Sequence, residues 1–340
     1  MTPMAPTAKP RILSGMQPTS DSLHLGNYLG ALVNWRTLQA DFDAYFFVAD
    51  LHSLTVATDP EVIRRRTRLT AAQFIAAGID PERSAVFCQS HIRETTEVAW
   101  VLGCQAAVGE MNRMTQFKDK TSKGQSANVG LFTYPVLMAS DILLYNPQYV
   151  PVGDDQRQHL EITRDLALRF NARFGEVFEV PEGYIPKESA RIMDLQDPTS
   201  KMSKSSSSPK GLLDIMDDPA RLAKKVRSAV TDTEAEIRYD VERKPGVSNL
   251  LVMASVLGDT PIATLEQQYS GRGYGDLKKD VAELVVETVT PFRQRIDELL
   301  DDPAELDGIL ARGAERAGEV ALATRDAVFD AVGLLPAGSR

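Results

Sequence analysis

Two lysines and two serines stand close together in the segment Lys201-Met202-Ser203-Lys204-Ser205, which is followed by three more serines and Pro209. A lysine ammonium is a compact cation that suits phosphate oxygens. A loop of small polar residues can close over a ligand and reopen. The segment Thr199–Pro209 therefore has the composition of a mobile loop that binds a polyphosphate. A solvated linker has the same composition, and this segment alone does not separate the two interpretations.

A second polar group lies near the start of the chain. Ser14-Gly15-Met16-Gln17-Pro18-Thr19 follows a short apolar run, and His24-Leu25-Gly26-Asn27 opens a helical pattern. Glycine lets a ligand approach the backbone closely, and the N-terminus of a helix offers N–H groups to anions. His24 and Asn27 are three residues apart, so their polar groups can point the same way. Taken alone, this pattern is equally typical of helix capping.

The third candidate is the apolar segment Tyr134–Tyr145. As a helix, it places Tyr134, Met138, Asp141 and Tyr145 on one stripe. An aspartate among such side chains is costly to bury without a partner. Its partner is either a neighbouring group of the protein or a ligand. An indole N–H, which can only donate, is one ligand group that needs a fixed acceptor, and a methionine packs well on an aromatic ring.

The elements around these residues predict a parallel sheet. Apolar runs at 11–14, 44–49 and 84–88 have the length of buried strands, and helical patterns at about 26–40 and 60–77 separate them. Strands that alternate with helices are typical of a doubly wound α/β sheet. In such sheets, ligands bind at the carboxyl ends of the strands.

The rest of the chain is predicted to be mostly helical. We expect a helix at Glu94–Gln116, a loop at 118–130, a strand at Tyr149–Val152 and a helix at Asp154–Arg173. The domain boundary is placed near 205–211. This gives a Rossmann-like catalytic domain at 9–205, with a helical connecting insertion at about 94–170, and a helical C-terminal domain at 206–335.

Composition narrows the class of protein. The 340 residues carry a net charge of −9 at a pI near 5.1, which argues against a protein that coats nucleic acid without specificity. No run of eighteen apolar residues exists, so no membrane span is expected. Cys88 and Cys104 are too few for a structural zinc site and the four histidines are scattered, so no metal site is expected. Two buried, reduced thiols fit a cytoplasmic protein.

Together, His24–Asn27 after the first strand and Lys201–Ser205 about 175 residues later resemble the paired HLGN and KMSKS signatures of class I aminoacyl-tRNA synthetases. Asn27 replaces the final histidine of the fullest form of the first signature, a variant usual among the tryptophan enzymes. The segments Thr133–Tyr145 and Val150–Asn171 closely resemble tryptophanyl-tRNA synthetases of the bacterial type. The tyrosine enzymes carry glutamine in place of Met138 and usually a Gly-Gly-Ser-Asp-Gln run in place of 153–156.

The resemblance implies two sets of ligand contacts. Residues expected at ATP are Gln17, Pro18, Thr19, Gly26, Asn27, Gly153, Asp154, Asp155, Ile192, Lys201, Met202, Ser203, Lys204 and Ser205. Those expected at tryptophan are Asp141 at the indole N–H, Tyr134 and Gln156 at the α-ammonium, and Met138, Val150, Val152 and His52 around the ring. The catalytic groups are expected to be Lys201, Lys204, His24, Lys120 and Gln17.

The resemblance also implies the reaction and its partners. Tryptophan is activated with ATP, which brings Mg²⁺, and is then transferred to the 3′-terminal adenosine of tRNA(Trp). Apolar residues of the 94–116 helix (Val98, Val101, Leu102, Val108 and Met111) are expected in a homodimer interface. Anticodon recognition is expected in the C-terminal domain, whose helix after Asp218 carries a basic face of Arg221, Lys224, Lys225 and Arg227. The alternatives are a tyrosine-specific relative, a small-molecule adenylyltransferase and a regulatory paralogue without activity.

Overall fold

The computed structural model describes residues 9–19, 21–56, 59–115, 128–151, 153, 156–184, 191–204 and 207–335. Its centre is a five-stranded sheet in the order β3-β2-β1-β4-β5, and every neighbouring pair is parallel. The strands are β1 (Arg11–Met16), β2 (Asp43–Val48), β3 (Ala85–Cys88), β4 (Tyr149–Pro151) and β5 (Glu182–Tyr184). The strand order changes direction between β1 and β4, which is where ligands bind in such sheets. The predicted Rossmann-like fold is confirmed.

Alternate side chains of the strands enter two separate cores, because successive strand residues point to opposite faces of a sheet. Phe46 and Val86 belong to one core, whereas Phe47 and Phe87 belong to the other. Helices on both faces supply the rest of these cores. They include α1 (Leu25–Asn27), α2 (Val33–Leu38), α3 (Asp50–Ser53), α4 (Pro60–Ala76), α5 (Glu94–Gly103), α6 (Val108–Arg113), α8 (Val129–Leu143) and α9 (Arg157–Phe174).

Three predicted helices differ from those observed. The stretch expected as one helix at 94–116 is broken, because α5 ends at Gly103 and α6 begins at Val108. The helix expected from Tyr134 begins at Val129, since the Asn128 side chain accepts the backbone N–H of Leu131 and caps it. Between α1 and α2 the backbone forms a π-helical turn, η1 (Tyr28–Leu32), which apolar periodicity does not reveal.

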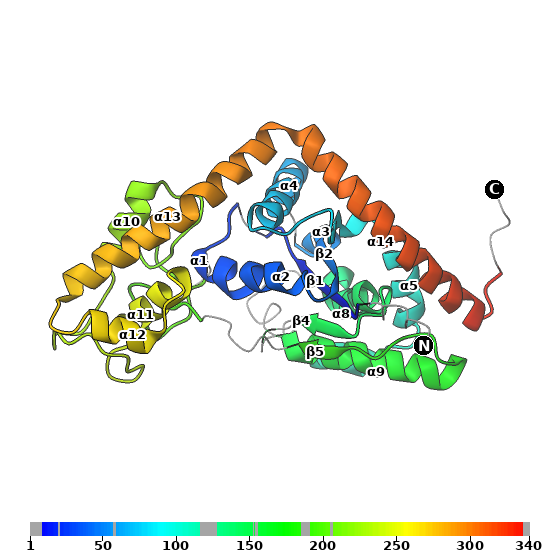
Figure 1. The fold of residues 1–340 in the computed structure, drawn as a ribbon. Helices are drawn as coiled ribbons and strands as arrows, with labels where there is room; N and C mark the ends of the chain where they lie inside the picture. The colour runs from blue at the N-terminus through cyan, green and yellow to red at the C-terminus, as the bar shows by residue number, and fades with distance from the viewer. Residues whose placement is uncertain are drawn as a thin grey trace, which may run out of the picture.

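The C-terminal region is helical, as predicted. It contains α10 (Pro219–Arg227), α11 (Pro245–Leu257), α12 (Ile262–Gln268), α13 (Tyr274–Asp301) and α14 (Pro303–Ala331). The two longest, α13 and α14, form an inverted V above the sheet (Figure 1). The last helix, α14, returns to pack on β3, where Gly313 faces the Val86 carbonyl so closely that a Cβ atom would lie 1.9 Å from its oxygen. The domain boundary near residues 205–211 remains a proposal.

Two predictions about single side chains were wrong. Cys88 is buried as expected, but Cys104 is exposed because it follows the last turn of α5. Lys225 does not belong to an exposed basic face. It is buried, and its Nζ donates to Asp217 Oδ2 at 2.5 Å and to the Leu212 carbonyl at 2.7 Å. The cytoplasmic location expected from the cysteines stays a prediction.

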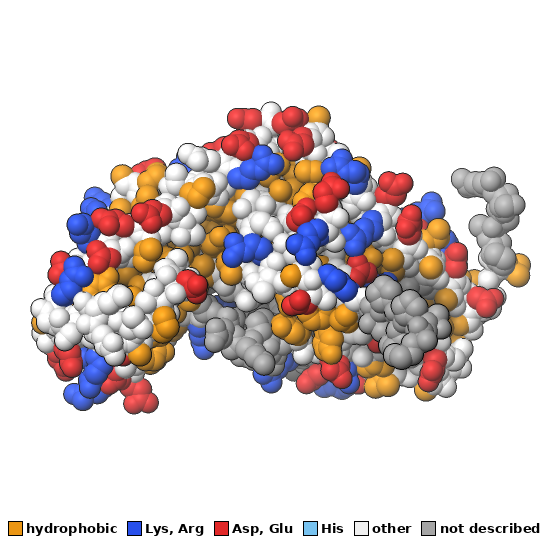
Figure 2. Space-filling model, viewed as in Figure 1, with side chains coloured by type: hydrophobic (Ala, Val, Ile, Leu, Met, Phe, Trp, Pro, Cys, Tyr) orange, Lys and Arg blue, Asp and Glu red, His pale blue; other side chains and the backbone are white. Residues whose placement is uncertain are grey.

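Charges on the face shown in Figure 2 are mixed, with acidic and basic side chains interspersed along α13 and α14. No single helix in the described ranges has both the length and the apolar composition of a membrane span; only the pair α11 and α12, bent by 110°, meets both criteria jointly.

Candidate active site

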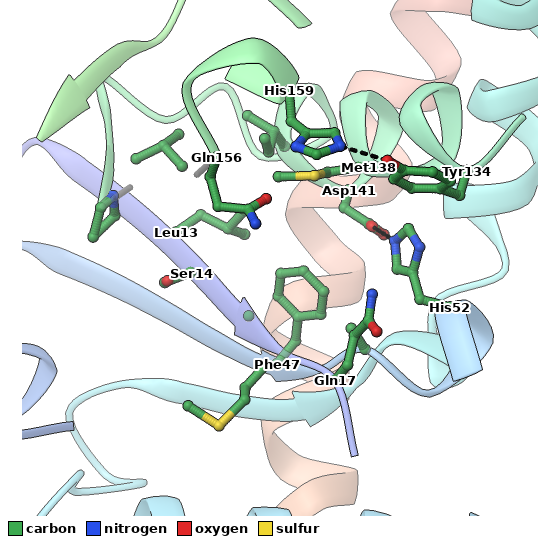
Figure 3. A pocket seen from close by; sticks show the side chains of 16 residues that line it. Leu13, Ser14, Gln17, Phe47, His52, Tyr134, Met138, Asp141, Gln156 and His159 are labelled. Carbon is green, nitrogen blue, oxygen red and sulfur yellow. Dashed lines mark hydrogen bonds and ion pairs between the residues drawn. The ribbon is translucent and has the colours of Figure 1, made fainter. Parts of the chain in front are cut away.

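A cavity of about 360 Å³ opens at the carboxyl ends of β1 and β4. The strands contribute the floor, and α3, α8 and α9 contribute polar side chains that converge on it (Figure 3). Its lining is Leu13, Ser14, Gly15, Met16, Gln17, Phe47, Ala49, His52, Tyr134, Met138, Asp141, Ile142, Val150, Pro151, Gln156 and His159. The cavity therefore lies where the strand order predicts a ligand, and it combines apolar walls with a few polar groups, as small-molecule sites do.

Asp141 is the buried acid in this cavity, and its side chain is 3% exposed. His52 Nε2 lies 2.9 Å from its Oδ2 atom. Gln89 Nε2 donates to both carboxylate oxygens, at 2.8 and 2.9 Å. Burial raises the pKa of Asp141, while the hydrogen bonds from His52 and Gln89 oppose that rise. The carboxylate is thus an acceptor held between donors.

The opposite wall pairs Tyr134 with His159. The Tyr134 hydroxyl lies 2.7 Å from His159 Nε2, and burial raises the pKa of Tyr134 to about 12, so the phenol is neutral. Met138, one turn along α8 from Tyr134, and Gln156, just before α9, also point toward the space (Figure 3). Val150 closes the β4 side. The stripe predicted from helical spacing is confirmed for Tyr134, Met138 and Asp141, which share the cavity.

Glycine at position 15 keeps this cavity open. A Cβ atom there would lie 2.5 to 2.7 Å from ring atoms of Phe47, which also lines the cavity. Any larger residue would push the Phe47 ring from its place on β2. The requirement is spatial, since a Cβ atom cannot approach that closely.

The HLGN motif (His24–Asn27) forms a reciprocal helix cap. His24 Nδ1 accepts the backbone N–H of Asn27 at 3.3 Å, and Asn27 Oδ1 accepts the backbone N–H of His24 at 3.4 Å. An Nδ1 that accepts carries no proton, so the neutral ring has its proton on Nε2. Burial, together with nearby Lys204 and Lys201, lowers the pKa of His24 to about 4. His24 is therefore a neutral donor at pH 7. Gly26 leaves room between this ring and Ile192.

The KMSKS motif (Lys201–Ser205) is anchored at its start. Lys201 forms an antiparallel bridge with Met193, and the Met202 backbone N–H donates to the Ile192 carbonyl at 3.1 Å. The Met202 side chain is buried in the core, so it supports the loop from below. Lys204 Nζ lies 3.5 Å from Asp214 Oδ2 and donates to the Ser22 carbonyl.

Backbone hydrogen bonds tie the two motifs together. The Leu25 N–H donates to the Leu213 carbonyl at 2.9 Å, and the Ile215 N–H donates to the Leu23 carbonyl at 3.0 Å. Segments almost 190 residues apart thereby form one short two-stranded contact. The structure brings together His24, Gly26, Ile192 and Lys204 as one group, and none of the four is part of the lining of the cavity that contains Asp141.

Ser203 of the KMSKS motif donates its backbone N–H to Ser207 Oγ at 3.0 Å. The other predicted residues fall into two groups. Gln17 lines the cavity, Pro18 and Thr19 continue from it, and the Gly153 carbonyl accepts the N–H of Gln156 at 3.0 Å in the turn before α9. Lys120, Val152, Asp154, Asp155 and Ser205 lie outside the described residues.

Sequence reasoning missed three site residues, Gln89, Phe47 and His159. Gln89 was detectable, because it directly follows the predicted strand 84–88, and polar residues at strand carboxyl ends face the site of a parallel sheet. His159 stands one turn beyond Gln156 on a predicted helix. Phe47 looked like ordinary core within an apolar run, and nothing in its sequence context distinguished it.

Comparisons with known proteins agree with this geometry. The family model described as tRNA synthetases class I (W and Y) matches residues 5–290. A tryptophan–tRNA ligase from Streptomyces avermitilis is 58% identical over 331 residues, which cover 97% of this chain and 98% of that protein.

Two solved structures are similar to this chain over almost its whole length. Tryptophanyl-tRNA synthetase from Mycoplasma pneumoniae superposes with a TM-score of 0.86 at 36% identity, covering 96% of this chain and 98% of that one. The Campylobacter jejuni enzyme complexed with ADP and tryptophan gives a TM-score of 0.83 at 36% identity, covering 95% and 100%. The chain belongs to the class I tRNA synthetases of the tryptophan and tyrosine family, and its activity is that of a tryptophan–tRNA ligase.

Proposed function

We propose that the cavity binds tryptophan with the indole N–H donated to Asp141 and the ring packed on Met138. The observation that carries this assignment is the carboxylate of Asp141, buried at the cavity wall with donors for partners. An indole N–H has no acceptor function, so a buried anionic acceptor suits it. A site built around such a polar partner rejects analogues that lack the matching group far better than size exclusion does.

The other tryptophan contacts follow from the cavity lining. Tyr134 and Gln156 hold the α-ammonium, since a phenol oxygen and an amide oxygen can both accept from it. His52 and Val150 bound the ring. The family resemblance adds Val152, which lies outside the described residues. This arrangement leaves the α-carboxylate facing the HLGN side of the cavity, where Gln17 stands.

ATP is proposed to lie between the HLGN and KMSKS motifs. Gly26 and Ile192 leave a flat space for the adenine and ribose, with Pro18, Thr19, Asn27, Gly153, Asp154 and Asp155 around the nucleoside. The phosphates meet Lys201, Lys204 and Lys120, with Met202, Ser203 and Ser205 completing the loop. Mg²⁺ is proposed to arrive with the triphosphate, whose oxygens supply most of its ligands.

The first step requires no nucleophile from the protein. A carboxylate oxygen of tryptophan forms a bond to the α-phosphorus while the bond to the β-phosphate oxygen breaks and pyrophosphate leaves. Lysine cations stabilise the charge that develops on the phosphates, and the Nε2 proton of His24 is a neutral donor beside them. Catalysis is therefore positioning and charge stabilisation.

The second step joins the activated tryptophan to tRNA(Trp). A hydroxyl of the 3′-terminal adenosine attacks the carbonyl carbon of the adenylate, and AMP leaves. We propose that the 206–335 region recognises the anticodon. On α10 the exposed cations are Arg221, Lys224 and Arg227, and Arg221 is paired with Asp217 at 3.2 Å, so Lys224 and Arg227 are the proposed phosphate contacts.

We also propose that two copies of the chain associate through α5, α6 and α8. Val98, Val101, Leu102 and Met111, which were expected at the interface, are instead buried in the chain's own core. Val108 is 67% exposed, and it joins Trp100 and Val129, each 77% exposed, around a groove of about 510 Å³. An exposed tryptophan beside an apolar groove is typical of a protein interface. Sedimentation of the wild-type chain and of Trp100→Glu tests this proposal; an active wild-type monomer contradicts it.

Amino-acid-dependent exchange of pyrophosphate into ATP tests the tryptophan assignment. Each of the twenty amino acids is offered to the wild-type chain and to Asp141→Ala, with Asp165→Ala, at an exposed position of α9, as the control. We expect tryptophan alone to support exchange. Asp141→Ala should raise the KM for tryptophan roughly 100-fold or more and leave the KM for ATP within about twofold. Equal tryptophan kinetics in Asp141→Ala contradict the assignment.

A further inference from the structure

Gln89 contacts the proposed acceptor of tryptophan without lining the cavity. It lies in the 3₁₀ turn η2 (Gln89–His91) that follows β3, and its side chain is 1% exposed. Its Nε2 atom donates to both oxygens of Asp141, while its Oε1 atom accepts the backbone N–H of Leu51 at 3.0 Å. One amide therefore joins the end of β3 to α3 and to the last turn of α8.

The orientation of this amide is fixed by its neighbours. The Leu51 N–H can only donate, so it must face the amide oxygen. The amide nitrogen then faces the Asp141 carboxylate, where it has acceptors on both sides. The reversed amide would place an oxygen against the carboxylate and a nitrogen against a donor, which leaves buried groups unsatisfied. These neighbours therefore allow one orientation of the Gln89 amide, in which Nε2 donates to Asp141.

The turn that carries Gln89 also holds α3, which carries His52. Asp50 Oδ1 accepts the backbone N–H groups of Leu51 and Ser90, each at 3.0 Å, and Asp50 Oδ2 accepts the Ser90 hydroxyl at 2.5 Å. His52, two residues along α3, places Nε2 2.9 Å from Asp141 Oδ2, and with its proton on Nε2 it is a donor to the carboxylate. Both donors to the carboxylate are therefore fixed to the same turn.

The contacts with His52 and Gln89 occupy some, but not all, of the acceptor positions of the Asp141 carboxylate. An ionised carboxylate has about four lone-pair positions. The His52 and Gln89 contacts use two on Oδ2 and one on Oδ1. The contacts of the described residues leave one lone-pair position, which is on Oδ1 of Asp141. Asp141 lines the cavity, so this position can accept from a ligand there.

We propose that Gln89 is a positioning residue for tryptophan selection, whose amide holds the Asp141 carboxylate so that Oδ1 presents one lone pair to the indole N–H. The inference rests on the proposed role of Asp141 and names the group that sets its orientation. Without the amide, the carboxylate can rotate about its side-chain bonds and lose the alignment that favours an N–H over other ring atoms.

The test is the preference for tryptophan over β-(3-benzothienyl)alanine, in which sulfur replaces the indole N–H. Gln89→Met removes the amide and keeps the side-chain volume. We expect kcat/KM for tryptophan to fall about 10- to 100-fold, mostly through KM, because a hydrogen bond to a charged group is weakened. The kinetics of the benzothienyl analogue should change less than threefold, so the preference for tryptophan should fall by at least about threefold.

A matched control is Gln39→Met. Gln39 is a buried glutamine that also bridges two backbone groups, accepting from the Asp80 N–H at 2.9 Å and donating to the Gly78 carbonyl at 2.8 Å, away from the cavity. It should lower thermal stability and leave the preference unchanged. If Gln89→Met slows both substrates equally, as Gln39→Met would, the amide has only a structural role and the inference is overturned.

Gln89→Glu supplies a second variant of the same shape. Its carboxylate faces that of Asp141, and two carboxylates this close share a proton. The other titratable groups coupled to Asp141 in the described part of the chain are His52 and Asp50 of α3 and Tyr145, which lies two residues past the end of α8. The activity of Gln89→Glu relative to wild type should be lower at pH 8 than at pH 6; a constant ratio contradicts the inference.

If Asp141→Ala itself leaves the preference for tryptophan unchanged, the proposed function fails, and this outcome is distinct from a failure of Gln89→Met alone.

Discussion

Lys204 Nζ lies 3.5 Å from Asp214 Oδ2 and donates a hydrogen bond to the Ser22 carbonyl. The second lysine of the KMSKS motif is therefore held against the segment that leads into the HLGN motif. A triphosphate must draw Lys204 from these partners or bind beside them. Because the ion pair is partly exposed, its contribution is small and exchange between partners is easy.

Substitutions at Lys204 and Asp214 should have opposite effects. Lys204→Met should lower kcat for pyrophosphate exchange about 10²- to 10³-fold, because a preorganised charge at the phosphates is lost. Asp214→Asn keeps an oxygen for the Met216 N–H and removes the negative charge that pairs with Lys204, so the KM for ATP should fall about two- to fivefold. Steady-state exchange kinetics measure both. Lys210→Met, an exposed lysine nearby, is the control, and a higher KM for ATP in Asp214→Asn contradicts the interpretation.

His24 should make folding sensitive to acid. Its pKa is lowered from 6.5 to about 4, so the unfolded chain takes up a proton between these values while the folded chain does not. The free energy of unfolding therefore falls as the pH drops from about 6.5 toward 4, by up to about 3 kcal/mol from this group. Urea unfolding of wild type and His24→Gln at pH 7.5 and 5 measures it. The variant should lose less stability on acidification, and equal losses would refute the assignment.

The sheet and much of the site follow from local patterns. Apolar runs between helical segments identified β1 to β4, and helical spacing placed Tyr134, Met138 and Asp141 on one stripe. These features depend on period and on burial, which a sequence displays directly. The adjacency of the two motifs came from the family resemblance, because no local rule predicts the Leu25 to Leu213 hydrogen bond across almost 190 residues.

What could not be predicted depends on tertiary contacts. Lys225 reads as part of a basic helix face, yet its ammonium turns inward to Asp217 and a carbonyl. Val98 and Leu102 read as interface residues, yet they complete the core beside α8. The periodicity of a sequence identifies an apolar face of a helix. Which element packs on that face is determined by the tertiary fold.

Gly313 offers a test of how α14 is fixed to the sheet. A methyl group there would lie 1.9 Å from the Val86 carbonyl oxygen, so Gly313→Ala must separate α14 from β3. We expect a loss of about 3 kcal/mol in the free energy of unfolding. Gly308→Ala on the same helix meets only the end of Arg312 at 3.6 Å and should raise stability by up to about 1 kcal/mol. Chemical denaturation compares them; equal stability of the two variants contradicts this packing.

The role of α10 in tRNA binding can be separated from catalysis. Lys224→Glu with Arg227→Glu reverses two exposed charges and leaves buried Lys225 intact. The KM for tRNA(Trp) should rise about tenfold, and its dependence on salt should weaken, because fewer phosphates are neutralised. Pyrophosphate exchange without tRNA should stay at the wild-type rate. If the charging kinetics match wild type at every salt concentration, this face of α10 does not bind tRNA.

The most direct test of the central claim observes the indole proton itself. Tryptophan carrying ¹⁵N in its indole ring is bound to the wild-type chain and, at saturation, to Asp141→Asn, and the N–H proton resonance is recorded. A hydrogen bond to a buried carboxylate should move this proton well downfield of its position in free tryptophan, and the neutral asparagine should bring it back most of the way. Identical proton shifts in the two complexes would show that Asp141 does not receive the indole N–H.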